Sequence, residues 1–101
     1  MLSPEGAERV REGQGRGVDL VLGLGNGGRP NEWGLGVVLS GPEGLFGPNP
    51  RAFGHNGYGG SFGLADPEER VSIGYVMNHM GNDLSGDPRQ VALIGSVYAC
   101  L

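Results

Sequence analysis

The stretch RAFGHNGYGGSFGLA, Arg51 to Ala65, places one of the chain's two histidines among five glycines in fifteen residues. Glycine has no side chain, so it either opens a turn or lets another group come close to the backbone. The spacing of Phe53 and Phe62 around these glycines still favours extended structure. We therefore predict a strand-like segment over Ala52–Ala65 that stays open to an approaching group around His55.

Further strands are predicted on both sides of this segment. Val71–Met80 alternates apolar residues with smaller or polar ones and carries the strongest strand pattern. Val18–Gly25 and Trp33–Ser40 are apolar and β-branched, which also indicates strands. Turn or loop sequences rich in Gly, Pro, Asn and Asp separate the predicted strands, at Asn26–Glu32, Gly41–Pro50 and Asp66–Arg70.

Helices are predicted at the two ends of the chain. Ser3 can cap a short helix over Ser3–Val10, with Pro4 at its first position. Asp87 and Pro88 repeat this arrangement, and Gln90 has the spacing of a capping box. The second helix would carry one apolar stripe, made of Val91, Ile94, Val97, Tyr98 and Leu101. The predicted class is α+β: an antiparallel meander with a C-terminal amphipathic helix packed on it.

Composition limits the functions that the chain can have. Its 101 residues suffice for one small domain, and no apolar run approaches the roughly 18 residues of a membrane span. The net charge of −4 comes with scattered arginines, so we expect no nucleic-acid partner. One cysteine, Cys100, and two histidines are too few for a structural zinc site, and we expect no bound metal.

A Gly-x-Gly-x-x-Gly sequence at Gly23, Gly25 and Gly28 has the spacing of a dinucleotide fingerprint. That fingerprint requires the third glycine to open a helix facing the pyrophosphate. Here Gly28 precedes RPNEWG, which cannot open a long helix. We interpret the sequence as a turn and predict no cofactor.

The motif GHNGYGG, Gly54 to Gly60, resembles the third conserved motif of the serine β-lactamase and penicillin-binding-protein superfamily. That motif is Lys-Thr-Gly in β-lactamases and His-x-Gly in several esterase- or peptidase-like branches. The longer run Trp33–Met80 looks like the C-terminal part of class C β-lactamase-like hydrolases, and GDPRQVALIGSVYACL is similar to their C-terminal helix. The resemblance implies part of a transpeptidase-type fold that cleaves a small ester or amide through an acyl-enzyme.

The resemblance also implies roles for five residues. The backbone N–H of Tyr58 would form half of the oxyanion hole, and His55 would face the substrate or the nucleophile. Asn56 would offer an amide to the substrate, while Gly57 and Gly59 would keep the strand approachable. His55 and Asn56 replace the Lys and Thr or Ser that hold a β-lactam carboxylate, which favours ester or amide hydrolysis over antibiotic hydrolysis. The alternative for His55 is a histidine that is merely hydrogen-bonded at a strand edge.

The nucleophile of that superfamily is the serine of Ser-x-x-Lys. All seven basic residues of this chain are arginines, so no such motif occurs in it, and Ser61 has no recognisable base nearby. We therefore expect residues 1–101 to form a single incomplete domain that lacks the N-terminal part of the same fold. The cellular compartment is not indicated. The alternative is a non-enzymatic, glycine-rich β domain that binds a partner through its exposed sheet.

Overall fold

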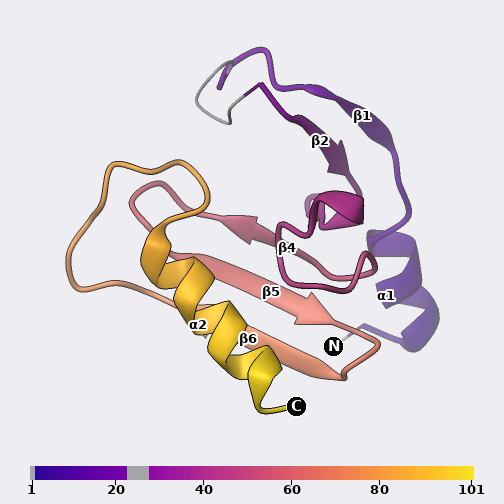
Figure 1. Ribbon diagram of the computed structural model, residues 1–101. Coiled ribbons are helices and arrows are strands. Elements are labelled where there is room, and N and C mark those ends of the chain that lie inside the picture. Colours follow the sequence, from indigo (N-terminus) through magenta and orange to yellow (C-terminus); the bar gives the residue numbers. More distant parts are fainter. Residues whose placement is uncertain (1, 23–27) are drawn as a thin grey trace.

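The computed structural model describes residues 2–22 and 28–101. Within these residues, six strands form one antiparallel sheet in sequence order, with helices near both ends of the chain (Figure 1). The elements are α1 Pro4–Val10, β1 Gly15–Val18, β2 Pro30–Trp33, β3 Val38–Leu39, the 3-10 helix η2 Gly41–Glu43, β4 Phe53–Asn56, β5 Phe62–Asp66, β6 Val71–Tyr75 and α2 Pro88–Ala99. The predicted α+β meander with a C-terminal helix is confirmed.

The glycine-rich stretch forms a hairpin, so the prediction of one strand-like segment over Ala52–Ala65 is wrong. Strands β4 and β5 pair in register, with His55 opposite Gly63. Between them the chain turns, and the φ angles of Gly59 and Gly60 are +97° and +119°. Only glycine adopts such angles without strain, so these two residues fix the position of the turn. Tyr58 consequently lies in the turn, outside the strand.

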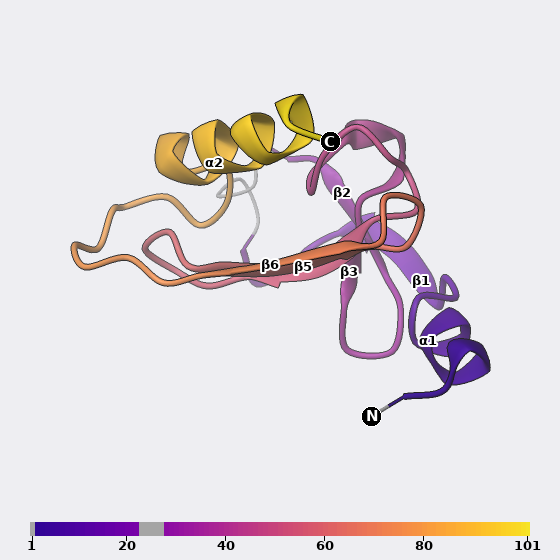
Figure 2. The same ribbon diagram turned by 90° about the horizontal axis from the view of Figure 1, so that it is seen from below.

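The core lies between the sheet and the segments that cover one of its faces. Its buried hydrophobic residues are Val38, Phe46, Ala52, Phe62, Leu64 and Ile94. Figure 2 shows α2 on this face of β5 and β6, and among the described residues no helix covers the opposite face beneath these two strands. There the neighbouring Gly63 and Gly74 are both exposed. The strands β5 and β6 therefore have one packed face and one open face.

Helix α2 begins as predicted, although one detail of its cap differs. The Asp87 side chain accepts a hydrogen bond from the Arg89 backbone N–H at 2.9 Å. Gln90 does not complete a capping box with it, because its buried amide donates to Asn56 Oδ1 of β4 at 2.8 Å. Of the predicted apolar stripe, Ile94 is buried and Val97 and Tyr98 are half-buried, whereas Val91 and Leu101 are exposed. The contact with the sheet uses the Gln90 side of the helix, which turns Val91 outward.

The C-terminal part of α2 is tied to the sheet through Asp66. The Tyr98 hydroxyl donates to Asp66 Oδ2 at 2.5 Å, and the Asn49 amide donates to the same oxygen at 2.7 Å. The backbone N–H groups of Glu68 and Glu69 donate to Oδ1. Burial opposes the charge of Asp66, but these hydrogen bonds outweigh it and lower the pKa of the carboxyl. Burial, followed by the hydrogen bond to Asp66, raises the pKa of Tyr98.

The N-terminal strands differ from the prediction. The predicted strand Val18–Gly25 is wrong over Asp19–Leu22, because the Asp19 carboxylate accepts hydrogen bonds from the Val21 and Leu22 N–H groups and forms a turn after β1. The second half of the predicted turn Asn26–Glu32 is occupied by β2, which pairs with β1. Residues 23–27 of both predictions, including Gly23 and Gly25 of the glycine motif, lie outside the described residues.

Two other predicted strands are shorter than expected. The predicted strand Trp33–Ser40 is interrupted at residues 34–37, where Gly36 has a φ of +80° and the Leu35 N–H donates to Val10 O at the end of α1. The predicted strand Val71–Met80 ends at Tyr75. In the described ranges, neither α1 nor α2 has the length and apolar character needed to cross a membrane.

Candidate active site

The candidate site lies where β4 loses its partner on one side. Strand β3 pairs only with Phe53 and Gly54, the first half of β4. The Gly57 N–H donates to Ser61 O, towards β5. Because backbone groups of successive residues in an antiparallel strand point to opposite sides, the N–H and C=O of Asn56 point to the edge beyond the end of β3. Among the described residues, the second half of β4 therefore presents a backbone edge without a neighbouring strand.

His55 lies at this edge with an exposed side chain. Its Nδ1 is 2.7 Å from the carbonyl oxygen of Asn56, and its ring centroid is 5.6 Å from that of Trp33. A carbonyl oxygen can only accept, so Nδ1 is the donor of this hydrogen bond. In the neutral ring Nε2 then carries the lone pair and can accept a proton. Nε2 is thereby left as an acceptor on the exposed side chain, while the catalytic role of His55 stays a prediction.

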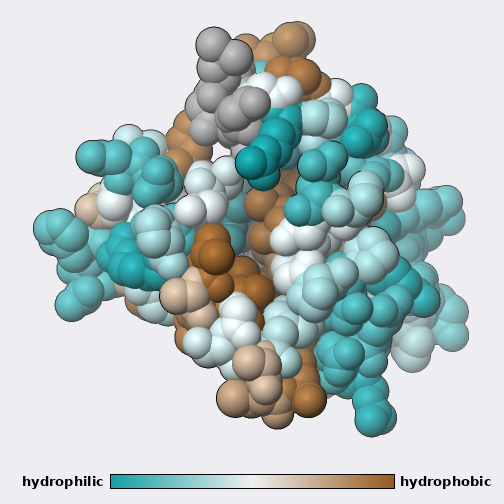
Figure 3. All heavy atoms as spheres, in the orientation of Figure 1, coloured by the Kyte–Doolittle hydropathy of each residue, from teal (hydrophilic) through white to brown (hydrophobic). Residues whose placement is uncertain are grey.

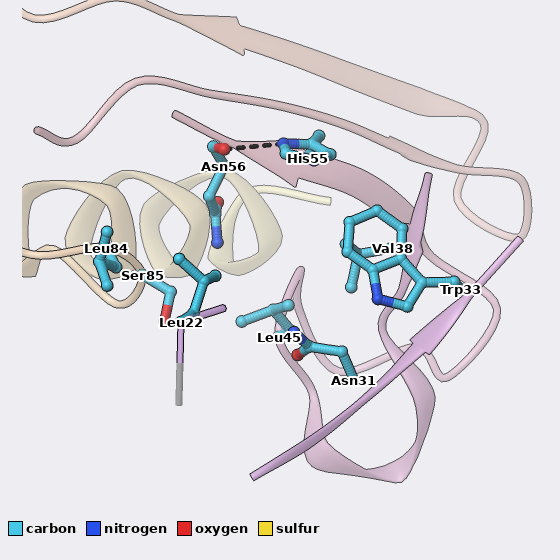
Figure 4. A pocket seen from close by; sticks show the side chains of 9 residues that line it. All are labelled: Leu22, Asn31, Trp33, Val38, Leu45, His55, Asn56, Leu84 and Ser85. Carbon is cyan, nitrogen blue, oxygen red and sulfur yellow. Dashed lines mark hydrogen bonds between the residues drawn. The ribbon is translucent and has the colours of Figure 1, made fainter. Parts of the chain in front are cut away.

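The Asn56 side chain points away from His55, into a small cavity beside α2 (Figure 4). Its Oδ1 accepts the hydrogen bond from Gln90, so this part of the amide is already used within the fold. The cavity has a volume of about 70 Å³ and is lined mainly by apolar side chains: Leu22, Asn31, Trp33, Val38, Leu45, His55, Asn56, Leu84 and Ser85. In the space-filling view, hydrophobic residues gather around the hollow next to α2 (Figure 3). The substrate contact of Asn56 stays a prediction.

The Tyr58 N–H in the turn after β4 is available as a donor. The N–H groups of Gly57, Gly59 and Gly60 donate to Ser61 O, Asp83 O and Gly57 O, respectively. Among the described residues, no acceptor is found for the Tyr58 N–H. The Tyr58 side chain is 57% exposed. A fixed N–H with no internal acceptor is what an oxyanion hole requires, although the role of Tyr58 stays a prediction.

Neighbouring side chains within the fold crowd the glycines of this turn. A Cβ atom on Gly57 would overlap the Ser61 hydroxyl. A Cβ on Gly59 would lie 2.9 Å from Met80 Cε, closer than real Cβ contacts allow. At Gly59 the φ of +97° also disfavours a side chain, so its absence there needs no ligand, whereas the Ser61 hydroxyl beside Gly57 can rotate away. The predicted role of Gly57 and Gly59 in substrate approach is an additional hypothesis.

Arg89 also contacts the turn, and the sequence reasoning did not identify it. Its Nη2 donates to Asp87 Oδ2 at 2.7 Å and to Gly59 O at 3.2 Å, and its Nη1 donates to His79 O at 2.6 Å. The hydrogen bond from the Arg89 side chain is the main cause that lowers the pKa of Asp87 to about 2. No motif could have revealed its contact with the turn, since the carbonyl groups of His79 and Gly59 lie 10 and 30 residues away in sequence.

Comparison with known proteins identifies the family of the chain. The family model described as Beta-lactamase matches residues 7–96. The chain therefore belongs to the beta-lactamase family. The resemblance to the β-lactamase and penicillin-binding-protein superfamily of serine hydrolases is confirmed.

Four solved chains are similar to this chain, including the following two. One is a family VIII carboxylesterase, 41% identical with a TM-score of 0.88. The other is a novel penicillin-binding protein homolog from Caulobacter crescentus, 44% identical with a TM-score of 0.88. Each match covers 99% of this chain and 26% of the other protein, so the chain spans about a quarter of their length. No curated protein matches the chain.

Proposed function

We propose that the chain is the C-terminal part of a β-lactamase-like serine hydrolase that cleaves small esters or amides through an acyl-enzyme. The observation that carries this proposal is the Tyr58 N–H, which has no acceptor among the described residues and follows the open edge of β4. The names of the two similar structures, a carboxylesterase and a penicillin-binding protein homolog, support acyl transfer as the reaction class.

In this proposal, the residues of the chain form one wall of the active site. The Tyr58 N–H donates to the oxyanion of the tetrahedral intermediate, and the loss of such a donor costs roughly 3–4 kcal/mol in the transition state. His55 Nε2 exchanges a proton or a hydrogen bond with the reacting groups. Asn56, next to His55, takes the place of the Thr or Ser of β-lactamases. The site therefore favours esters or amides over β-lactams as substrates.

The remaining machinery belongs to a part of the fold outside this chain. No Ser-x-x-Lys sequence is possible without lysine. Ser61 Oγ lies against Gly57, and among the described residues it has no hydrogen bond to a histidine or a carboxylate. We therefore assign the nucleophile and its base to the N-terminal part, which would face the open edge of β4.

A hybrid enzyme tests this proposal. Residues 1–101 replace the matching 26% of the family VIII carboxylesterase, and hydrolysis of short nitrophenyl esters is measured. We expect turnover that survives Tyr58→Ala, which keeps the N–H, and is abolished by Tyr58→Pro, which removes it. Circular dichroism shows whether each variant folds, and a fluorophosphonate probe shows whether the nucleophile is intact.

A folded hybrid without turnover would contradict the proposal. It would favour the alternative, a β domain that binds a partner through its sheet. Equal activity of folded Tyr58→Pro and Tyr58→Ala hybrids would exclude the oxyanion role of Tyr58.

A further inference from the structure

We propose that Asp87 and Arg89 form a positioning pair that holds the Gly57–Gly60 turn, and with it the Tyr58 N–H, in the geometry needed for acyl transfer. This inference rests on the proposed function. Neither residue needs to touch the substrate, because both act through the backbone of the turn. The pair joins three segments that are distant in sequence: the turn after β4, the segment after β6 and the first turn of α2.

Each nitrogen of the Arg89 guanidinium group donates at least one hydrogen bond within the fold. Its Nε and Nη2 bind the two carboxylate oxygens of Asp87 at 3.0 and 2.7 Å, which is a bidentate arrangement. The remaining bonds run from Nη1 to His79 O at 2.6 Å and from Nη2 to Gly59 O at 3.2 Å. A lysine has one nitrogen and cannot reproduce this planar set of directions. The arrangement is therefore specific for arginine.

Asp87 also fixes the position of the Arg89 side chain. Its side chain is 4% exposed and is held by the N–H of Arg89 at the start of α2. A Cβ on Gly60 would lie 2.7 Å from Asp87 Oδ2, and a Cβ on Gly81 would lie 2.9 Å from the same oxygen. The carboxylate is thus packed between two glycines, one in the turn after β4 and one in the segment after β6. Any side chain at these positions would displace it.

No other side chain shares this task among the described residues. The backbone of the turn is otherwise bound by main-chain groups, from Gly59 N–H to Asp83 O and from Gly81 N–H to Gly59 O. Arg89 is the one side chain that donates to the carbonyl oxygen of Gly59. The Gly59 carbonyl belongs to the Gly59–Gly60 peptide plane, and one further plane, held by the bond from Gly59 N–H to Asp83 O, separates it from the plane of the Tyr58 N–H. Fixing this carbonyl therefore restricts the turn that carries the proposed oxyanion donor.

The first test uses the 101-residue chain and needs no catalysis. Amide hydrogen exchange and the amide NMR shift of Tyr58 are measured for wild type, Arg89→Ala, Arg89→Lys and Asp87→Asn. We expect Arg89→Ala to accelerate exchange at Gly59 and Gly81 about tenfold or more, with little change at Leu64 in the sheet. Arg89→Lys should restore little of the protection. Arg51→Ala, which removes an exposed arginine paired with Glu8 and Glu68, is the matched control.

The second test uses the hybrid enzyme. Arg89→Ala and Asp87→Asn should each lower kcat about tenfold or more with KM nearly unchanged, because the donor acts on the transition state. Wild-type exchange rates at Gly59 and Gly81 in Arg89→Ala would overturn the inference, as would a uniform acceleration over the whole sheet. A loosened turn with unchanged kcat would also overturn it, while the proposed function would still stand. If Arg89→Ala does not fold, the inference is judged from the exchange rates and kcat of Asp87→Asn and Arg89→Lys.

Discussion

Two glycines of the hairpin differ sharply in what surrounds them. Gly59 is buried at a φ of +97°, and an added Cβ would lie 2.9 Å from Met80 Cε. Gly63 faces open space on the uncovered side of β5. The same substitution should therefore have opposite effects at the two positions.

We expect Gly59→Ala to lower the free energy of unfolding by about 1–2 kcal/mol or more, from backbone strain plus the contact with Met80. Gly63→Ala should be neutral or stabilising by about 0.4–1 kcal/mol, because it restricts the unfolded chain. Urea denaturation of both variants measures the difference. Equal destabilisation by the two substitutions would show that Gly59 is not held by its neighbours.

His55 offers a second prediction at the scale of one residue. Its side chain is exposed, so His55→Ala should change the free energy of unfolding by about 0.5 kcal/mol or less. If the imidazole transfers a proton, kcat/KM of the hybrid enzyme should fall about 10²–10⁴-fold. The opposite pattern, a lower Tm with unchanged kcat/KM, would make His55 a residue of the strand edge and nothing more.

At the scale of elements, α2 is tied to the sheet by a buried hydrogen bond between Tyr98 and Asp66. Tyr98→Phe keeps the ring but removes one donor from a buried carboxylate. We expect it to cost about 1.5–3 kcal/mol of stability, the range for hydrogen bonds to charged groups. Tyr58→Phe, at an exposed tyrosine, is the control and should be neutral. A neutral Tyr98→Phe would mean that Asn49 and the two backbone donors suffice for Asp66.

Acid should weaken the attachment of α2 at both ends. The folded state lowers the pKa of Asp87 from 3.8 to about 2, mainly through Arg89, and also lowers that of Asp66. The unfolded state therefore takes up protons at a higher pH than the folded state. The stabilisation is complete above about pH 4 and should be lost as the pH falls towards 2. Chemical denaturation across this range measures it, and Asp87→Asn should flatten the pH dependence.

Elements that are determined by residues close together in sequence could be predicted, and features that depend on distant residues could not. Both helices were predicted closely, because Ser3, Asp87 and the prolines after them act within one turn of the chain. The turn at Asp19 was missed because apolar residues follow it, and the Asx hydrogen bonds override their strand propensity. In the candidate site, a motif singled out His55 and Tyr58. Arg89 could not be found this way, since only the folded chain brings it to the Gly59 carbonyl.

At the scale of the molecule, the sheet is covered unevenly. One face of β5 and β6 packs against α2, and the other continues into a shallow apolar surface that includes Phe53 and Ala65. The outer edge of β6 also has no neighbouring strand in the described part of the chain. In the proposed intact hydrolase, the N-terminal part would cover these surfaces and bring the nucleophile to the edge of β4. The same arrangement determines what the isolated chain can do.

We expect the isolated chain to show no hydrolysis of nitrophenyl esters above buffer and no labelling by a fluorophosphonate probe. The oxyanion donor acts only on charge that develops after a nucleophile attacks, and without that step the Tyr58 N–H accelerates nothing. Ser61 is the serine of the hairpin, but its hydroxyl lies against Gly57 with no base bound to it among the described residues. Ser61→Ala is therefore expected to match wild type in both assays, and the hybrid enzyme is the positive control. Stoichiometric labelling that disappears in Ser61→Ala would place a nucleophile within this chain and overturn the assignment of the catalytic serine to the N-terminal part.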